Sequence, residues 1–212
     1  MTEANEQQPF QIPQRILVLR DLCIRTRGAD CTRCGEACPK GALSFPEGKP
    51  PIVDEAACSL CGICQGTCDA FASTSYTLTQ AHAGARRAAM GARPAIITCT
   101  ENVSEQDDPA SNVVALPCLA MLPAELWAAL LAEGADVQAA IDMERCETCE
   151  KAGGPAQALY AERIAQAEEW TQRSVGFAPS LPQAADEGRR AGLANAGADG
   201  ARRSRFTAMV SQ

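Results

Sequence analysis

The sequence predicts an α+β module built around two cysteine runs, followed by a small parallel α/β domain, a C-terminal helix and a disordered tail. Three observations lead to this prediction. Two runs of cysteines repeat at an offset of 30 residues in the first third of the chain. Residues 94–152 contain short apolar stretches and one helical pattern, with little alternation of polar and apolar residues. Residues 174–212 are rich in Pro, Gly, Ala and Arg and show no hydrophobic period.

Length and composition narrow the class of protein. A chain of 212 residues fits one large or two small domains, and an aromatic content of 4% limits the apolar core. The first residues show no basic start with an apolar stretch, so we expect no signal peptide. Without a run of about 18 apolar residues, we expect no membrane span. Twelve cysteines in a chain read as cytoplasmic bind metal more often than they form disulfides, and bound metal would supply stability that the core lacks.

The charge is unevenly distributed along the chain. The net charge is −7, with about −10 on residues 1–171 and about +3 on residues 172–212. An acidic body argues against binding to nucleic acid. It suits contact with basic protein partners, or it serves solubility alone.

The pattern divides the chain into six segments. Short strands are expected at 16–19 and 52–53, with a Pro/Gly-rich loop at 39–57 between the runs. A helix over 73–93 is expected to break near Gly84 and Gly91 and to end before Pro94. The predicted segments are a flexible N-terminus (1–15), the cysteine module (16–75), a helical linker (76–93), the α/β domain (94–152), an amphipathic helix (155–173) and the tail (174–212).

Inside the α/β domain the pattern predicts strands at 95–99, 113–118 and 137–141. Leu122, Leu126, Leu130 and Leu131 mark one face of a helix that ends at Gly134. Residues 153–155, Gly-Gly-Pro, are read as a breaker. The helix after them carries an apolar stripe, which we expect to pack on its own domain or, less favourably, to dock a partner.

The cysteine runs have a spacing that few chemistries other than iron–sulfur binding require. In C-x2-C-x2-C-x3-C, the first three thiolates wrap one face of an iron–sulfur cube and the fourth reaches a second cube. Zinc sites use separated C-x2-C pairs instead. The spacing therefore predicts two [4Fe–4S] clusters, the first held by Cys23, Cys31, Cys34 and Cys68, and the second held by Cys58, Cys61, Cys64 and Cys38.

Residues 16–75 resemble the bacterial-type two-cluster ferredoxins. The resemblance implies a ferredoxin-type dicluster fold, a pseudo-twofold pair of βαβ units around two clusters, and one-electron transfer. The sequence departs from that family twice: Cys23 and Cys31 are spaced C-x7-C, and Asp69 stands where the family usually has Pro. The segments that carry the resemblance are Cys31-Thr-Arg-Cys34-Gly-Glu-Ala-Cys38-Pro39-Lys-Gly-Ala-Leu and Val53-Asp54 ahead of Cys58-Ser-Leu-Cys61-Gly-Ile-Cys64.

Four further cysteines follow the predicted strands of the α/β domain. Because the carboxyl ends of parallel strands meet at one edge of a sheet, these cysteines are expected to converge on a third metal site, an iron–sulfur cluster rather than zinc. A redox-active dithiol of Cys146 and Cys149, or plain buried thiols, are the alternatives. The four cysteines are Cys99, Cys118, Cys146 and Cys149.

This second half resembles, loosely, the delta subunit of methyl-viologen-reducing hydrogenases. That family is a small α/β iron–sulfur protein that connects a hydrogenase to a partner reductase through a [2Fe–2S] cluster. Its cysteine spacings differ, so the cluster type does not carry over. The resemblance rests on Ile96-Ile97-Thr-Cys99, Leu116-Pro-Cys118 and Glu133-Gly134-Ala135-Asp136 ahead of Cys146.

The combined interpretation is a cytoplasmic iron–sulfur protein that relays single electrons between redox protein partners, as a subunit of a larger oxidoreductase complex of hydrogenase or reductase type. No catalytic residue is assigned, and the only histidine, His82, is read as a surface residue. No G-x-G-x-x-G or Walker loop indicates a flavin, NAD or nucleotide. The alternatives are a redox enzyme that uses the third site and a zinc-binding interaction protein.

Overall fold

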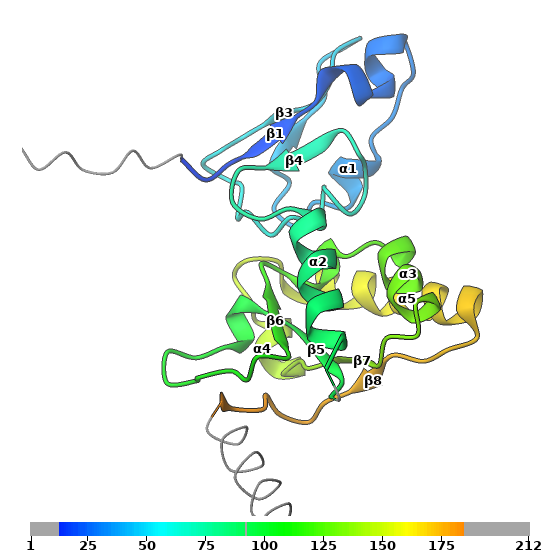
Figure 1. The fold of residues 1–212 in the computed structure, drawn as a ribbon. Coiled ribbons are helices and arrows are strands. Elements are labelled where there is room, and N and C mark those ends of the chain that lie inside the picture. Colours follow the sequence, from blue (N-terminus) through cyan, green and yellow to red (C-terminus); the bar gives the residue numbers. More distant parts are fainter. Residues whose placement is uncertain (1–12, 92, 185–212) are drawn as a thin grey trace, which may run out of the picture.

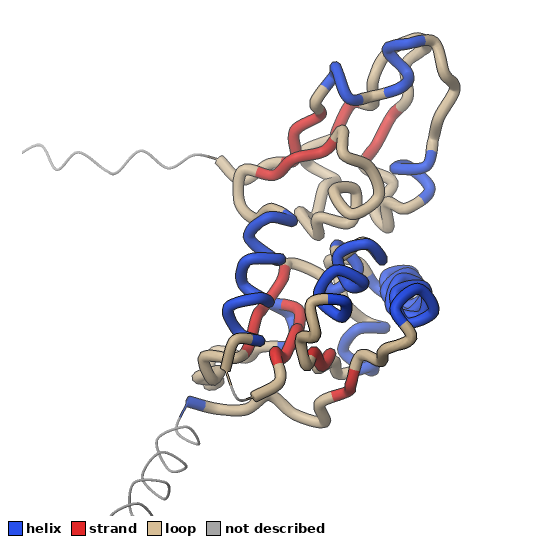
Figure 2. The backbone as a smooth tube through the Cα atoms, turned by 45° about the vertical axis from the view of Figure 1, so that its right-hand side comes forward, coloured by secondary structure: helices blue, strands red, loops and turns tan. Residues whose placement is uncertain are grey.

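A computed structural model describes residues 13–91 and 93–184 of the chain, and it shows two regions stacked one on the other (Figure 1). The cysteine-run region comprises residues 13–75. The sheet region comprises residues 76–91 and 93–184, and its first helix extends between the two regions (Figure 2). The flexible N-terminus predicted for 1–15 and the tail predicted for 174–212 fall largely outside the described residues.

The cysteine-run region has little regular structure. Strand β1 (Ile16–Val18) pairs antiparallel with β4 (Phe71–Ser73), and β2 (Leu43–Ser44) pairs antiparallel with β3 (Ile52–Val53). The helical elements are η1 (Arg20–Leu22), η2 (Ile24–Arg27) and the single turn α1 (Arg33–Glu36). Its buried core consists of Ile16, Cys23, Cys34, Ala70 and Phe71. Because so few apolar side chains are buried, the loops need other constraints.

One such constraint is Arg25, a buried cation in the loop between Cys23 and Cys31. Its guanidinium donates to the carbonyl oxygens of Lys49 at 2.9 Å, Pro46 at 3.1 Å and Cys31 at 3.1 Å, and pairs with Asp30 at 2.9 Å. It also lies 5.4 Å from the centre of the Phe45 ring. Since a buried charge is tolerated only when its donors are satisfied, these bonds fix the shape of the loop.

The sheet region contains the parallel α/β unit that the sequence predicts. Its four-stranded sheet has the order β6-β5-β7-β8, and each neighbouring pair is parallel. The three predicted strands are present, with the second and third ending two residues early. The strands are β5 (Ala95–Cys99), β6 (Val113–Leu116), β7 (Val137–Ala139) and β8 (Gly176–Phe177).

Helix α2 (Leu78–Ala89) differs from the helix predicted over 73–93. A capping box between Thr77 and Gln80 starts it later, and it continues through Gly84 without a break. A Cβ at Gly84 would lie 3.3 Å from Val114 of β6, so the small residue permits close packing on the sheet. Because α2 contacts β5 and β6, it belongs to the sheet region and is more than a linker.

The remaining helices are α3 (Ala124–Ala132), α4 (Met143–Glu147) and α5 (Gly153–Thr171). The sequence reading of 153–155 as a breaker is wrong, because these residues form the first turn of α5, where Gly and Pro are tolerated. Short helix α4 was not predicted. The start of the predicted tail is wrong as well: residues 174–184 include β8, and Val175 is buried. A strand of two residues has no period to detect.

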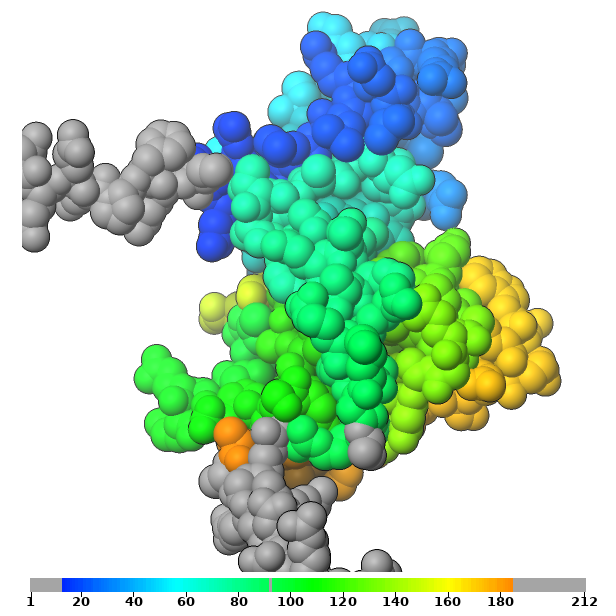
Figure 3. Space-filling view, in the orientation of Figure 1, coloured from blue at the N-terminus to red at the C-terminus, as the bar shows by residue number. Residues whose placement is uncertain are grey.

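The main core belongs to the sheet region but reaches into the cysteine-run region. Trp127, Leu130 and Leu116 are at most 1% exposed, and Ile63 and Cys61 of the cysteine-run region join the same cluster. The amino acids on both sides therefore bury a common apolar surface. The space-filling view shows the two regions in contact, with α2 extending from their junction along the sheet region (Figure 3).

Polar contacts reinforce this interface. Arg163 of α5 donates to Thr67 Oγ1 at 2.9 Å and to the carbonyl oxygen of Ala120. Ser59 Oγ donates to the carbonyl oxygen of Lys151 at 2.6 Å. These bonds fix the second cysteine run against the sheet region. Within the described residues, no helix is both long and apolar enough to cross a membrane.

Candidate metal centres

The first group of thiols (Cys23, Cys31, Cys34 and Cys68) lies between β1, α1 and the end of the second run. Cys23 and Cys34 are buried in one cluster, and Cys68 packs against it. Burial raises the pKa of Cys34, and the next causes include the neighbouring thiolates of Cys68 and Cys31. The fourth cysteine of the second run therefore lies with the cysteines of the first run.

The second group (Cys38, Cys58, Cys61 and Cys64) shares one cavity beneath β2 and β3. All four line a space of about 370 Å³, its opening to solvent included, together with apolar side chains such as Ile16, Leu43 and Ile63. Burial raises the pKa of Cys64 to about 12, and the charges of Cys61, Cys58 and Cys38 add to this rise. The fourth cysteine of the first run therefore lies with the second run.

The loop from Cys58 to Cys64 is curled by its backbone. Leu60 and Gly62 have φ values of 58° and 78°, in the left-handed region that residues other than glycine rarely adopt. Asp54 starts the loop, because its carboxylate accepts bonds from the N–H groups of Ala56 at 3.0 Å and Ala57 at 3.3 Å. The resulting turns bring three thiols of one run into the same cavity.

The third group consists of Cys99, Cys118, Cys146 and Cys149. Cys99 ends β5, Cys118 follows β6 after one proline, and the other two lie in and after α4, which follows β7. All four line one cavity of about 440 Å³, its opening included. Thus four cysteines that are up to 50 residues apart converge at the carboxyl edge of the parallel sheet.

The thiols of the third group lie close enough to influence one another. Burial raises the pKa of Cys118 to about 12, with further rises from Cys61, Cys99 and Cys146. Burial is also the first cause that raises the pKa of Cys146, followed by Cys99 and Cys149. Four of these five effects on the pKa come from cysteines of the third group, and the fifth comes from Cys61 of the second group.

Asn102 holds the loop after Cys99 to the end of β7. Its amide Nδ2 donates to Thr98 Oγ1 at 3.0 Å and to the carbonyl oxygen of Ala140 at 3.1 Å, while its Oδ1 accepts from the N–H of Asp142 at 3.2 Å. Lys151 pairs with Glu101 at 2.8 Å and closes the same edge. These contacts fix how far Cys99 lies from the α4 segment.

Tyr160 of α5 forms part of the wall of the third cavity. Its hydroxyl donates to the sulfur of Met143 at 3.3 Å. Burial raises the pKa of Tyr160 to about 12, and the charges of Cys146, Cys99 and Cys118 add to the rise. From the sequence, Tyr160 is one residue of the apolar stripe predicted on this helix, with no separate role. Its position four residues after Ala156 on the stripe that faces the core was the available signal.

Backbone N–H groups point at sulfurs in all three groups, and that of Gly35 lowers the pKa of Cys34 although burial raises it more strongly. The N–H groups of Ile63 and Gln65 lower the pKa of Cys61 and Cys64, and those of Asn102 and Ala120 lower the pKa of Cys99 and Cys118, although burial raises all four more strongly. Such N–H donors stabilise thiolate sulfur and tune the potential of iron–sulfur centres. Thiols and N–H donors together fit an iron–sulfur group chemically.

The second and third groups are neighbours across the interface of the two regions. Cys61 raises the pKa of Cys118, after burial as the larger cause. Ser59, two residues before Cys61, donates to Lys151, two residues after Cys149. Cys58 and Cys64 of the second group also pack against the buried cluster that contains Cys23 and Cys34. The second group therefore adjoins both the first and the third.

A single metal ion needs several ligand side chains around one point. No three His, Cys, Asp or Glu side chains in residues 13–91 and 93–184 are arranged to hold one metal ion. A zinc ion takes its ligands within about 2.3 Å of one point. The thiolates of an iron–sulfur cube bind different irons and lie farther apart. The relevant observation for an iron–sulfur cluster is therefore which thiols line the same cavity. All twelve cysteines are free of disulfides.

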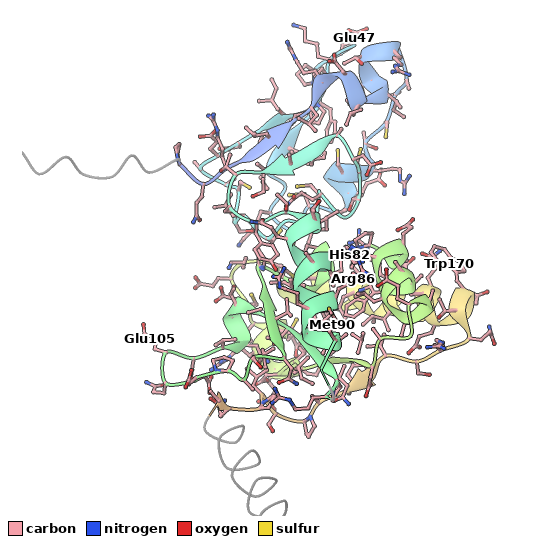
Figure 4. The ribbon with its side chains drawn as sticks, in the orientation of Figure 1. Glu47, His82, Arg86, Met90, Glu105 and Trp170 are labelled. Atoms are coloured by element: carbon pink, nitrogen blue, oxygen red, sulfur yellow. The ribbon has the colours of Figure 1, made fainter. Side chains whose placement is uncertain are left out.

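His82 does not belong to any of the three groups. It lies on the same side of α2 as Arg86 (Figure 4), and its side chain is 35% exposed. Its Nε2 lies 3.9 Å from Glu133 Oε1, whereas Arg86 binds that carboxylate at 2.8 Å. His82 is thus half-buried beside an ion pair, somewhat less exposed than the sequence suggested.

Comparisons of the chain with models of known protein families, with curated proteins and with solved structures found no match.

Proposed function

We propose that this protein relays single electrons between partner redox proteins or subunits of an oxidoreductase complex. In this proposal, the first and second groups each hold a [4Fe–4S] cluster, and the third group holds a further iron–sulfur centre. Such clusters accept and release one electron without a large change in structure. The ferredoxin-type dicluster fold is part of the same proposal.

The observation that carries the proposal is the exchange of the fourth cysteines. Cys68 of the second run raises the pKa of Cys34 in the first run, after burial as the larger cause. Cys38 of the first run lines the cavity that holds the other three cysteines of the second group. Two groups of four thiols are therefore built from both runs at once. A chain that used its cysteines only as small core residues would have no reason to sort them in this way.

The surroundings of the thiols support the redox assignment. The walls of the second cavity are mostly apolar, which limits access of water to the sulfurs. The N–H donors of Ile63, Gln65, Asn102 and Ala120 are fixed by the backbone, so they need no rearrangement when the charge of the centre changes. Both features suit repeated one-electron transfer.

The third group extends the relay into the sheet region. It adjoins the second group through Cys61 and Cys118, so an electron on the second centre has a neighbour on each side. The expected order is first, second and third centre. A redox enzyme that uses the third site would instead need a position there for a substrate to bind.

The test is the metal content of protein prepared without oxygen. We expect about eight irons and eight sulfides per chain from the first two groups, and additional iron from the third. Electron paramagnetic resonance of the dithionite-reduced protein should show interacting centres. The variant Cys118→Ser should lose only the iron of the third group and keep the signals of two cubes. Cys68→Ser should disturb the first.

Protein without acid-labile sulfide would contradict the proposal, whatever its zinc content. A change in the spectrum of the third centre on addition of a small substrate would favour the enzyme instead. Equal iron in the parent protein and in Cys118→Ser would remove the third centre from the relay but leave the first two.

A further inference from the structure

The loop that carries Cys23 presents apolar side chains to solvent on both sides of a buried cysteine. Leu19, Leu22 and Ile24 are 41%, 55% and 52% exposed, whereas Cys23 is 7% exposed. Leu19 is the N-cap of the 3₁₀ turn η1 and Leu22 is its last residue, and residues three apart in such a turn lie one above the other. These three side chains are called the loop patch below.

The loop patch is held in place by the rest of the loop. Arg25 is buried and satisfied by four oxygen partners, and Thr26 Oγ1 donates to the carbonyl oxygen of Cys23 at 2.6 Å. An apolar residue on a loose loop can turn inward, but this loop is fixed with its apolar residues outward. Grouped exposed apolar side chains of this kind mark contact surfaces.

The location of the patch suits access to the first group. The η1 and η2 turns lie at the end of the molecule that is farthest from the sheet region (Figure 1), so the rest of the chain does not cover them. Cys23 lies directly between Leu22 and Ile24 and belongs to the first group. A protein bound on the patch would therefore contact a ligand loop of the first centre.

Charge separates this end of the molecule from the other. Residues 15–33 contain five arginines and two aspartates, whereas residues 94–171 contain three basic and fourteen acidic side chains. Arg20 of η1 and Arg27 of η2 are exposed on the turns that carry the patch. Opposite charges on two surfaces speed their encounter and set their orientation.

We propose that an acidic redox protein docks on the loop patch and exchanges one electron with the first centre. This inference rests on the proposed function, since it needs a redox centre at the first group. One electron leaves the partner's reduced centre and enters the first centre, and no bond is formed or broken. The apolar side chains provide the contact area, and the arginines select an acidic partner.

The test measures binding to the full-length, iron-loaded chain in the oxidised state. The probes are an acidic plant-type [2Fe–2S] ferredoxin and, for comparison, the basic protein cytochrome c. We expect calorimetry to show binding of the acidic probe at low salt, and weaker binding as salt rises. Stopped-flow reduction by the acidic probe should follow the same salt dependence.

Two variants separate the apolar and the charged contributions. Leu22→Ser with Ile24→Ser should weaken binding of the acidic probe by about tenfold or more, because apolar contacts at the centre of an interface dominate its affinity. Arg20→Glu with Arg27→Glu should weaken it as well and remove its salt dependence. Met90→Ser is the matched control, since Met90 is 86% exposed at the far end of α2 (Figure 4) and should change nothing.

Several outcomes would overturn the inference. They are equal binding of both probes, unchanged binding in both double variants, or sedimentation showing that the patch joins two copies of this chain instead. Iron and sulfide contents and bleaching by dithionite are measured on each variant. Absence of clusters from the parent protein would contradict the proposed function. If the variants contain clusters that bleach normally and still bind the acidic probe as the parent does, only the docking inference is contradicted.

Discussion

The two regions of this molecule are stabilised in different ways. The cluster of buried residues in the cysteine-run region has five members, of which two are cysteines, whereas the cluster centred on the sheet region has 22. The first region has two-stranded ribbons and single turns, and the second has a four-stranded sheet covered by helices. The comparison indicates that the sheet region can rely on apolar burial. Under the proposed function, bound clusters supply the stability that the cysteine-run region lacks.

Part of the cysteine-run region shares the apolar core of the sheet region, so the contrast does not apply to all of its residues. Cys61 and Ile63 are part of the core of the sheet region, so one side of the second group rests on a surface that needs no metal. The first group lies in the small cluster around Ile16 and Phe71. We therefore expect the first group to be the less stable of the two when iron is absent.

For the iron–sulfur protein proposed above, removal of iron should have the largest effect. Without iron, the cysteine-run region should lose most of its structure, because its own apolar contacts are few, while the sheet region should persist. Hydrogen exchange followed by mass spectrometry measures this directly. Amides of residues 16–60 should exchange rapidly in the iron-free protein, and those of β5, β7 and α3 should remain protected.

The comparison predicts an order within the lost region as well. Amides near Ile63 should retain more protection than those near Cys23, because Ile63 is buried against the sheet region. Equal protection of both regions after iron removal would show that the apolar contacts alone hold the cysteine-run region. Equal loss in both would show that the sheet region has no independent stability.

Truncation of Trp127 should have the next largest effect, now on the sheet region. Trp127 is fully buried in α3, and Trp127→Ala should lower the free energy of unfolding by about 3–5 kcal/mol through the cavity that it leaves. The indole Nε1 has no hydrogen-bond partner among the described residues. Trp127→Phe should therefore cost less than its loss of volume suggests, because it removes an unsatisfied donor.

Urea unfolding followed by far-ultraviolet circular dichroism measures both variants in the iron-loaded protein. Phe177→Ala is the control, since Phe177 is 71% exposed and should change the free energy of unfolding by less than about 0.5 kcal/mol. A cost for Trp127→Ala as small as for this control would contradict the assignment of the main core.

The sequence predicts those features that repeat or that carry a strong period. Strand β5 was predicted with its observed bounds because five successive residues from Ala95 to Cys99 suit a buried parallel strand. The parallel arrangement itself followed from apolar strands without alternation. The assignment of cysteines to two groups followed from the C-x2-C-x2-C-x3-C spacing, in which the fourth cysteine reaches the other centre, and binding of iron to them remains a prediction.

Features that depend on tertiary contacts were missed. Helix α4 spans only Met143–Glu147 and starts at a cap on Asp142, so it has too few turns to show a period. Strand β8 exists because β7 offers an unpaired edge, which the sequence of β8 does not reveal. The contact of Ser59 with Lys151 joins residues 92 positions apart, and neither residue type indicates such a partner.

The smallest effect is expected at the interface, from Gly66→Ala. A Cβ at Gly66 would collide with the carbonyl oxygen of Met121, lie 2.8 Å from its carbonyl carbon and lie 3.0 Å from Nη1 of Arg163. Backbone atoms cannot move aside cheaply, so the variant should cost about 1–3 kcal/mol by overpacking. The matched control is Gly154→Ala, because a Cβ there meets no atom within 4 Å.

The Gly66→Ala variant should show less cooperative unfolding of the two regions. Calorimetry of the iron-loaded variant should resolve two unfolding transitions, one for each region. The reason is that the added Cβ disturbs both bonds of Arg163, to Thr67 and to Ala120, at the same time. The magnetic interaction between the second and third centres should weaken in the same variant, because the separation of Cys61 from Cys118 depends on this contact. Unchanged transitions and unchanged spectra, with Gly154→Ala alike, would show that the two regions are joined mainly by the apolar cluster around Ile63 and that Gly66 is incidental to it.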